Sequence, residues 1–144
     1  MAAYVKFEKF SEDMVNAVHN FGTHAFKVLL ALSAPSASLD AVKADLTDEL
    51  GTGGGYTAGG TATTISISRS GGTTTVDATN VVFTASGGNI GPFRYAVLYN
   101  DTPTSPADPL VGYWDYGSNA TITDGNTFTV DTGSGTGNDL FTLA

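Results

Sequence analysis

The chain has 144 residues, a mass of 14.8 kDa, no cysteine and a formal net charge of −8. This length fits one domain, and eighteen glycines with only 14% charged residues are typical of short strands joined by tight turns. The acidic balance excludes nucleic-acid binding driven by phosphate neutralisation, and the absence of cysteine excludes disulfides and thiolate nucleophiles.

Apolar runs in the sequence are short. The longest, Val28 to Leu32, is far below the roughly 20 residues that span a bilayer. The first ten residues carry charges where a signal peptide has its apolar run. We therefore expect a soluble protein with no membrane partner and no secretion signal.

Residues 1–10 alternate weakly, which predicts an extended arm that pairs with another element. From Phe7 the apolar residues recur at intervals of three and four, the stripe of an amphipathic helix. Ser11 is suited to cap the N-terminus of a helix and Gly22 to end it, so the sequence predicts a helix at about residues 11–21. Residues 1–24 are expected to form this arm and helix, and residues 25–144 the β-sandwich of a single structural domain.

The next segments predict a strand, a connection and a loop. Residues 26–32 carry apolar side chains on nearly both faces, which is typical of an internal strand. Residues 38–50 fit either a short helix or an irregular crossover, because acidic residues near the end oppose the helix dipole. The glycines of residues 51–60 predict a loop that is either flexible or tightly turned.

A first hairpin is predicted over residues 61–76. A two-residue loop formed by a serine and the following glycine, Gly71, places Ile65 opposite Val76 and Ile67 opposite Thr74. This register places the apolar side chains on one face, and it puts glycine in a two-residue turn, where glycine is favoured.

A second hairpin is predicted around an Asp-Gly-Asn turn at residues 124–126. A three-residue loop places Ile122 opposite Phe128 and Ala120 opposite Val130, again with the apolar side chains on one face. The asparagine of the turn is expected to take the left-handed conformation.

Counting from Phe26, turn residues separate about eight strands, of which the last lies at residues 140–143. The segment from Phe93 to Tyr99 has large side chains on both faces, which predicts a central strand or one covered by a partner. The sequence thus predicts an all-β fold: a jelly-roll-like two-sheet β-sandwich, or else a small barrel, with an N-terminal arm and one short α-helix.

The sequence offers little catalytic chemistry. His19 lies beside the apolar stripe of the helix and His24 opens a strand, so packed or surface roles are favoured over a general base. The aspartates lie in or beside loops, where turn geometry recruits them, and this is favoured over an ordered cation or a catalytic pair. No catalytic, cofactor-binding or metal-binding residue is expected.

Three aromatic residues, Tyr113, Trp114 and Tyr116, have the composition of a sugar-stacking platform. Core packing is favoured, because Trp114 shares its face with Leu110. Gly112 indicates either a bulge or the close approach of another group.

Several stretches together carry a family resemblance. They are VKFEKFSEDMVNAVHNFGTHAFKVLL at residues 5–30, GYTAGG at 55–60, FTASGGNIGPFRYAVLYND at 83–101, DPLVGYWDYG at 108–117 and DGNTFTVD at 124–131. In these stretches the chain resembles a widespread family of small virion proteins of tailed bacteriophages. The likeness covers nearly the whole chain, and the sequence departs from the family pattern mainly at residues 39–54.

The resemblance implies a capsid cement or decoration protein with a jelly-roll-like fold, bound outside an icosahedral shell, where it reinforces contacts between shell subunits. The implied partners are the major capsid protein and further copies of the chain, as a dimer or trimer, and no cofactor is implied. The implied location is the capsid exterior of the virion, after production in the cytoplasm of a bacterial host. The alternative is a tail- or fibre-associated virion protein that binds carbohydrate.

The predicted partner contacts lie in the arm and in two loops, residues 86–92 and 100–109. The glycines and prolines of these loops fix the shape of an exposed backbone where another protein can sit. The residues predicted to touch a partner are Tyr4, Val5, Phe7, Asn89, Ile90, Pro92, Thr102, Pro103 and Pro106.

Overall fold

The computed structural model describes residues 2–133 and 139–144 and is mostly β, with 49% of residues in strands and 8% helical. The predicted all-β fold is confirmed. The helical elements are α1 (Glu8–Val15) and a 3-10 turn, η1 (Lys43–Asp45). The strands are β1 (Ala3–Lys6), β2 (Phe26–Ala31), β3 (Thr61–Thr63), β4 (Ile65–Ser70), β5 (Thr73–Ala78), β6 (Val81–Thr84), β7 (Ile90–Asn100), β8 (Leu110–Ile122), β9 (Thr127–Val130) and β10 (Phe141–Leu143).

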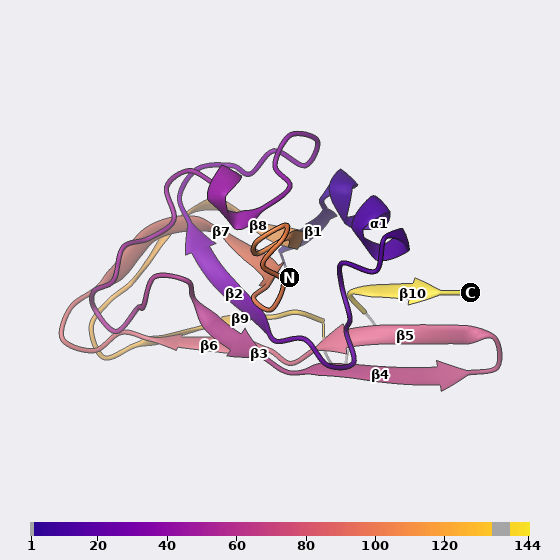
Figure 1. Cartoon of the computed structure of the whole chain (residues 1–144). Coiled ribbons are helices and arrows are strands. Elements are labelled where there is room, and N and C mark those ends of the chain that lie inside the picture. The colour runs from indigo at the N-terminus through magenta and orange to yellow at the C-terminus, as the bar shows by residue number, and fades with distance from the viewer. Residues whose placement is uncertain (1, 134–138) are drawn as a thin grey trace.

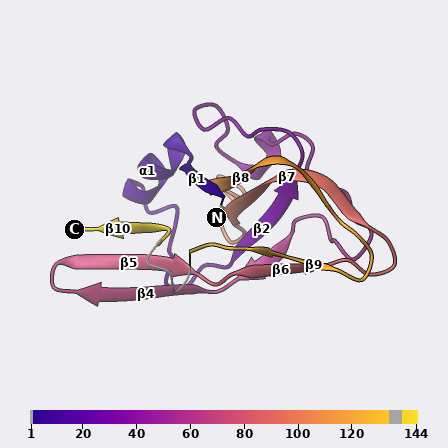
Figure 2. The same ribbon diagram turned by 180° about the vertical axis from the view of Figure 1, so that it is seen from behind.

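The strands are arranged in antiparallel sheets. A five-stranded sheet has the order β1-β8-β7-β2-β3, a three-stranded sheet the order β10-β5-β4, and β6 pairs with β9. The two smaller sheets follow one another along the lower layer of Figure 1, and β2, β7 and β8 of the larger sheet cross above them, as the reverse view in Figure 2 also shows. The edge strand β3 of the larger sheet lies beside β6 and β4 in the lower layer. Buried side chains from both layers form one hydrophobic cluster between them.

β2 and β7 lie inside the larger sheet, as their apolar sequences predict. Both faces are covered, and Val28, Leu29 and Leu30 are fully buried. The segment between β2 and β3 folds over the sheet, and the hydroxyl of its buried Tyr56 accepts a hydrogen bond from the Leu30 N–H at 3.1 Å.

The glycine-rich loop at residues 51–60 is tightly turned. Gly60 has a φ of +78°, and a Cβ added to it would overlap the carbonyl oxygen of Val28. The Tyr99 hydroxyl donates a hydrogen bond to the Gly59 carbonyl at 2.6 Å. Because Gly60 lies directly against the backbone of β2, this position requires glycine for both its conformation and its space.

The N-terminal arm pairs within its own domain. β1 adds to the edge of β8, with Tyr4 opposite Trp114. Gly112 makes room for the arm, because a Cβ there would overlap the ring of Tyr4. The register of β8 against β7 also shifts beside Gly112, so both predicted alternatives, a bulge and a close approach, are present. The rings of Tyr4 and Trp114 are 5.1 Å apart between centroids, and Phe7 is fully buried.

The prediction of a helix at residues 11–21 is wrong in its boundaries, since α1 spans Glu8–Val15 and Ser11 lies inside it. Phe7 occupies the N-cap without a side-chain hydrogen bond. The helix ends where Ala17 takes a φ of 58°, with Ala17 N–H bonded to Met14 O at 3.2 Å and Val18 N–H to Asp13 O at 2.8 Å. This is the hydrogen-bond pattern of a Schellman ending, in which alanine stands where glycine is usual.

The first predicted hairpin forms with a different register. Ile65 pairs with Ala78 and Ile67 with Val76, so the two-residue loop is Gly71 and the glycine that follows. The slip of two residues keeps the isoleucines on the predicted face, because side chains alternate with a period of two. It also lengthens the hairpin, which extends from the body in Figure 1.

The second predicted hairpin is wrong. Ile122 pairs with Ile90 in the larger sheet, whereas Phe128 pairs with Phe83 in the two-stranded sheet. A turn does form, with the Asn126 N–H donating to Thr123 O at 3.0 Å, but Gly125 takes the left-handed conformation with a φ of 85°. The turn therefore carries the chain from one layer to the other.

Residues 38–50 form the irregular crossover, one of the two predicted alternatives. Its only helical part is η1, where the Asp45 carboxylate accepts hydrogen bonds from the N–H groups of Ala41 at 2.9 Å and Val42 at 3.0 Å. These bonds lower the pKa of the Asp45 carboxyl. The predicted last strand is confirmed as β10, which pairs with β5.

Candidate functional site: an apolar groove around the strand β10

Exposed apolar side chains gather around β10. Five large apolar residues are exposed among those described, and three of them, Val15, Ile67 and Leu143, line cavities on the two sides of this strand. Their exposed fractions are 87%, 51% and 56%. Since these residues come from α1, β4 and β10, the fold and not a local sequence creates the patch.

Two cavities make up this groove, which we call the β10 groove. The larger has a volume of about 420 Å³ and lies between residues 17–22 and the face of the three-stranded sheet. The smaller, of about 270 Å³, lies between α1 and β10. Met14, Phe141 and Leu143 line both cavities, so the two are neighbours across the side chains of β10.

The strand register explains the apolar floor of the groove. Phe141 pairs with Val76, and Val76 pairs in turn with Ile67, which places the three side chains on one face of the sheet. The rings of Phe10 and Phe21 cover the inner part of this face, with centroids 5.4 and 5.1 Å from that of Phe141. The outer part of the face has no such cover among the described residues and forms the open side of the groove.

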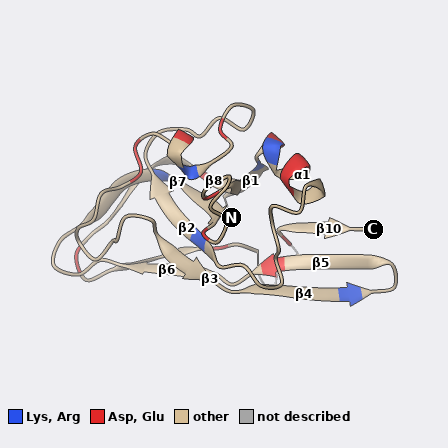
Figure 3. Ribbon diagram, viewed as in Figure 1, with Lys and Arg blue, Asp and Glu red and all other residues tan. Residues whose placement is uncertain are grey.

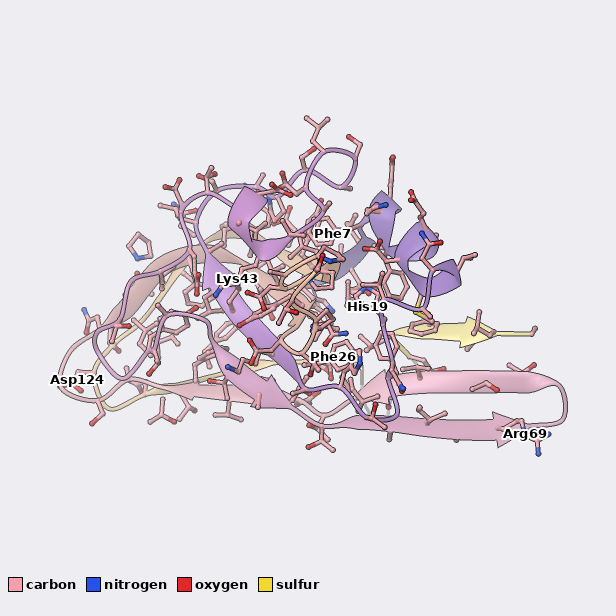
Figure 4. The ribbon with its side chains drawn as sticks, viewed as in Figure 1. Phe7, His19, Phe26, Lys43, Arg69 and Asp124 are labelled. Carbon is pink, nitrogen blue, oxygen red and sulfur yellow. The ribbon has the colours of Figure 1, made fainter. Side chains whose placement is uncertain are left out.

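His19 borders the larger cavity and is only 6% exposed. Figure 4 shows it with Phe26 below α1, and the two rings stack with centroids 6.4 Å apart. Burial, with a smaller electrostatic contribution from His24, lowers the pKa of His19 to about 4. The imidazole is therefore neutral at neutral pH.

The hydrogen-bond network assigns the tautomer of His19. Asn100 Oδ1 accepts the Thr102 N–H at 3.2 Å, so the amide nitrogen of Asn100 faces Nδ1 of His19 at 3.2 Å and Nδ1 of His24 at 2.9 Å. An amide nitrogen only donates, so both Nδ1 atoms accept and the neutral His19 ring carries its proton on Nε2. This buried Nε2–H has no hydrogen-bond partner among residues 2–133 and 139–144.

We expect the free energy of unfolding to fall as the pH drops from about 6.5 to about 4. The unfolded His19 has an ordinary pKa near 6.5, whereas the folded value is about 4, so in this window only the unfolded state gains the proton. The loss reaches on the order of 3 kcal/mol at the acid end, and the contribution is fully present above the unfolded pKa. Urea unfolding at a series of pH values measures it.

The variant His19→Phe is the matched control, because it keeps an aromatic ring and removes the titrating group. Its stability should vary less between about pH 6.5 and pH 5 than that of the parent. The carboxyls of Asp45 and Asp115 have lowered pKa values and lose their contributions only at lower pH. An unchanged pH slope in His19→Phe would contradict the assignment to His19.

The β10 groove carries no acid, although the chain has fourteen. Lys6 is the one lysine or arginine among its described lining residues, and the Lys6 Nζ donates to Ser11 Oγ and forms no ion pair with a described carboxylate. Figure 3 shows β10 without charge, and Asp77 of β5 pairs in register with Ser66 and so points to the opposite face. The groove is thus an apolar, slightly cationic surface on an acidic protein.

The predicted partner-contact residues lie elsewhere and are not brought together. Phe7 and Ile90 are buried, with exposed fractions of 0% and 1%, and offer no surface to a partner in this conformation. The others are exposed or half-buried, and their role in partner binding stays a prediction: Tyr4, Val5, Asn89, Pro92, Thr102, Pro103 and Pro106. Asn89 Oδ1 accepts the Asp124 N–H at 2.9 Å, whereas Thr102 Oγ1 accepts the Ala25 N–H at 2.8 Å on a separate part of the surface.

The aromatic residues that could have stacked on a sugar do not form a platform. Trp114 is only 1% exposed and lies in the core, which confirms the favoured interpretation, while Tyr113 and Tyr116 are half-buried. The described residues contain no group of three or more histidines and acids placed to hold a metal ion. Within the same residues, no helix has the length and hydropathy that a membrane crossing requires.

The sequence gives little sign of the β10 groove, because its exposed members lie far apart along the chain. One signal was present: Ile67 is an apolar residue in a strand whose other members after Ile65 are serines and an arginine. Comparisons with protein-family models, with curated proteins and with solved structures find no match to this chain.

Proposed function

We propose that the chain is a structural virion protein that binds the outside of a bacteriophage capsid and reinforces the contacts between shell subunits. The observation that carries the proposal is the resemblance at residues 83–101 and 108–117, which contain all of β7 and the first part of β8. These strands are the centre of the larger sheet, so the resemblance covers the part of the chain on which the fold depends.

The physical properties of the surface support the proposal. A cement protein acts through contacts, and symmetry multiplies a modest contact energy over many copies on a shell. The chain offers an exposed loop with Pro106, and an apolar groove around β10. Pro92, expected in a loop, lies instead in the first part of β7, where it is exposed. Its neutral His19, held by Asn100 and packed among aromatic rings, is suited to a structural role.

The test is to add the purified chain to shells that lack it. We expect the chain to sediment with the shells, to saturate at a fixed ratio to the shell subunit, and to raise the temperature at which the shells release DNA. Electron microscopy of the intact particle should then place its density on the head. Density on the tail, or no sedimentation with shells, would contradict the proposal.

Variants in the exposed loops show which surface is used. Ser86→Arg and Thr104→Arg change exposed residues of the two predicted contact loops, and a matched change, Ser68→Arg, lies on the extended hairpin. We expect the loop variants to weaken shell binding by about tenfold, as the loss of one good contact does, and Ser68→Arg to leave it unchanged.

A further inference from the structure

We propose that the β10 groove binds a segment of a partner protein that carries two apolar side chains next to a carboxylate. The inference stands on the groove alone and does not depend on the proposed function. The β10 groove lies apart from the predicted contact loops and from the aromatic residues of β8.

Apolar burial provides the first part of the recognition. Val15, Ile67 and Leu143 are more than half exposed, so an occupant that covers them removes apolar surface from water. The two cavities lie on the two sides of β10 and share Phe141 as a wall. One side chain cannot fill both, whereas a chain segment with two apolar side chains can place one in each.

The second part is a hydrogen bond to His19. Its Nε2–H is a buried donor without a partner, and such a group costs about 1–3 kcal/mol until an acceptor reaches it. The ring borders the larger cavity, where a side chain of the segment is expected. Nε2 itself has almost no accessible surface, so a backbone carbonyl beside that side chain reaches it only after a local opening of the groove.

The third part is charge. The groove has no carboxylate among its described lining residues, and Lys6 at the smaller cavity forms no ion pair with a described residue. A carboxylate on the segment would complete the pairing of Lys6. Because the protein as a whole is acidic and repels anions, a groove lined by Lys6 and by no carboxylate opposes an acidic segment less than the acidic parts of the surface do.

The experiment uses the full chain and a short blocked peptide that alternates leucine with glutamate. We expect saturable amide chemical-shift changes around residues 14–22, 65–67, 74–76 and 141–143, and a slower exchange of the His19 Nε2 proton. A peptide with lysine in place of glutamate should bind about tenfold more weakly, because it meets Lys6 with a like charge.

Ile67→Glu is expected to weaken peptide binding by about tenfold or more. Val82→Glu is the matched control, because Val82 has the same exposed fraction of 51% but lies on β6, outside the groove. Both sites are exposed, so both variants should fold, and circular dichroism checks this. Equal effects of the two variants, or an absence of shifts around the groove, would overturn the proposal.

Two further outcomes identify a different occupant. If sedimentation shows a dimer of the free chain that Ile67→Glu dissociates, a second copy fills the groove and the proposal is wrong. If decanoate shifts the same amides while the leucine-glutamate peptide does not, the groove is a site for a small apolar anion, and the proposal is again wrong.

Discussion

Replacing Gly60 with alanine should lower the free energy of unfolding by roughly 3 kcal/mol or more. The φ of +78° is unfavourable for alanine, and the new Cβ would overlap the Val28 carbonyl oxygen. Val28 lies in β2, which is paired on both sides, so its backbone has little freedom to move away. Urea unfolding of Gly60→Ala against the parent measures the loss.

Substitutions at two other glycines separate the two causes of this loss, the unfavourable φ and the steric overlap. Gly71→Ala places alanine at a φ of +59° in open space. The substitution should therefore lower the free energy of unfolding by the conformational cost alone, about 1 kcal/mol. Gly72→Ala has open space and no left-handed φ, so its stability should stay within about 0.5 kcal/mol of the parent. A Gly60→Ala variant no less stable than Gly71→Ala would show that the loop does not pack on β2 as described.

Replacing Phe7 with alanine should cost about 3–5 kcal/mol. Its side chain is fully buried, and the centroid of its ring lies 5.3 Å from that of Tyr113. The substitution therefore opens a cavity where the arm enters α1. The sequence places Phe7 among the partner contacts, whereas the structure places it in the protein's own core. Thermal unfolding of the free protein distinguishes these two roles.

Leu39→Ala is the control for Phe7→Ala. Leu39 is 82% exposed, so its truncation should change the free energy of unfolding by less than about 0.5 kcal/mol. If Phe7→Ala kept the parent stability and only weakened binding to a partner, the arm would have to leave β8 in solution. That result would restore Phe7 as a contact residue and contradict the packing described here.

The strands that the sequence predicts well are those whose pattern reports burial directly. The residues of β2 and β7 are apolar on both faces because both faces are covered, and no knowledge of neighbouring strands is needed to see this. The pairing partner of a strand, in contrast, does not follow from the strand's own pattern. Ile122 and Phe128 have the alternation of a hairpin, yet they pair in different sheets, because pairing depends on where the turn at Gly125 directs the chain.

The sequence did not predict that α1 ends at Val15, and the reason is local. The apolar stripe continues through Phe21, but Phe21 reaches the core from a turn after the helix, and Ala17 is exposed. Ala17 takes the left-handed conformation that sequence patterns assign to glycine. The sequence could not predict the β10 groove, because its residues come from α1, β4, β5 and β10 and meet only once the sheets have formed.

The pairing of β1 with β8 sets an order for the synthesis of the protein. Tyr4 leaves the ribosome early, whereas Trp114, its partner across the ladder, is made only after most of the chain. Until then β1 has no edge to join, and the side chains of Tyr4 and Phe7 have no core to enter. Contacts between such distant residues slow folding and expose nascent chains to association. Chaperones that act on the nascent chain should therefore engage the segment around Tyr4 and Phe7 until Trp114 has been made.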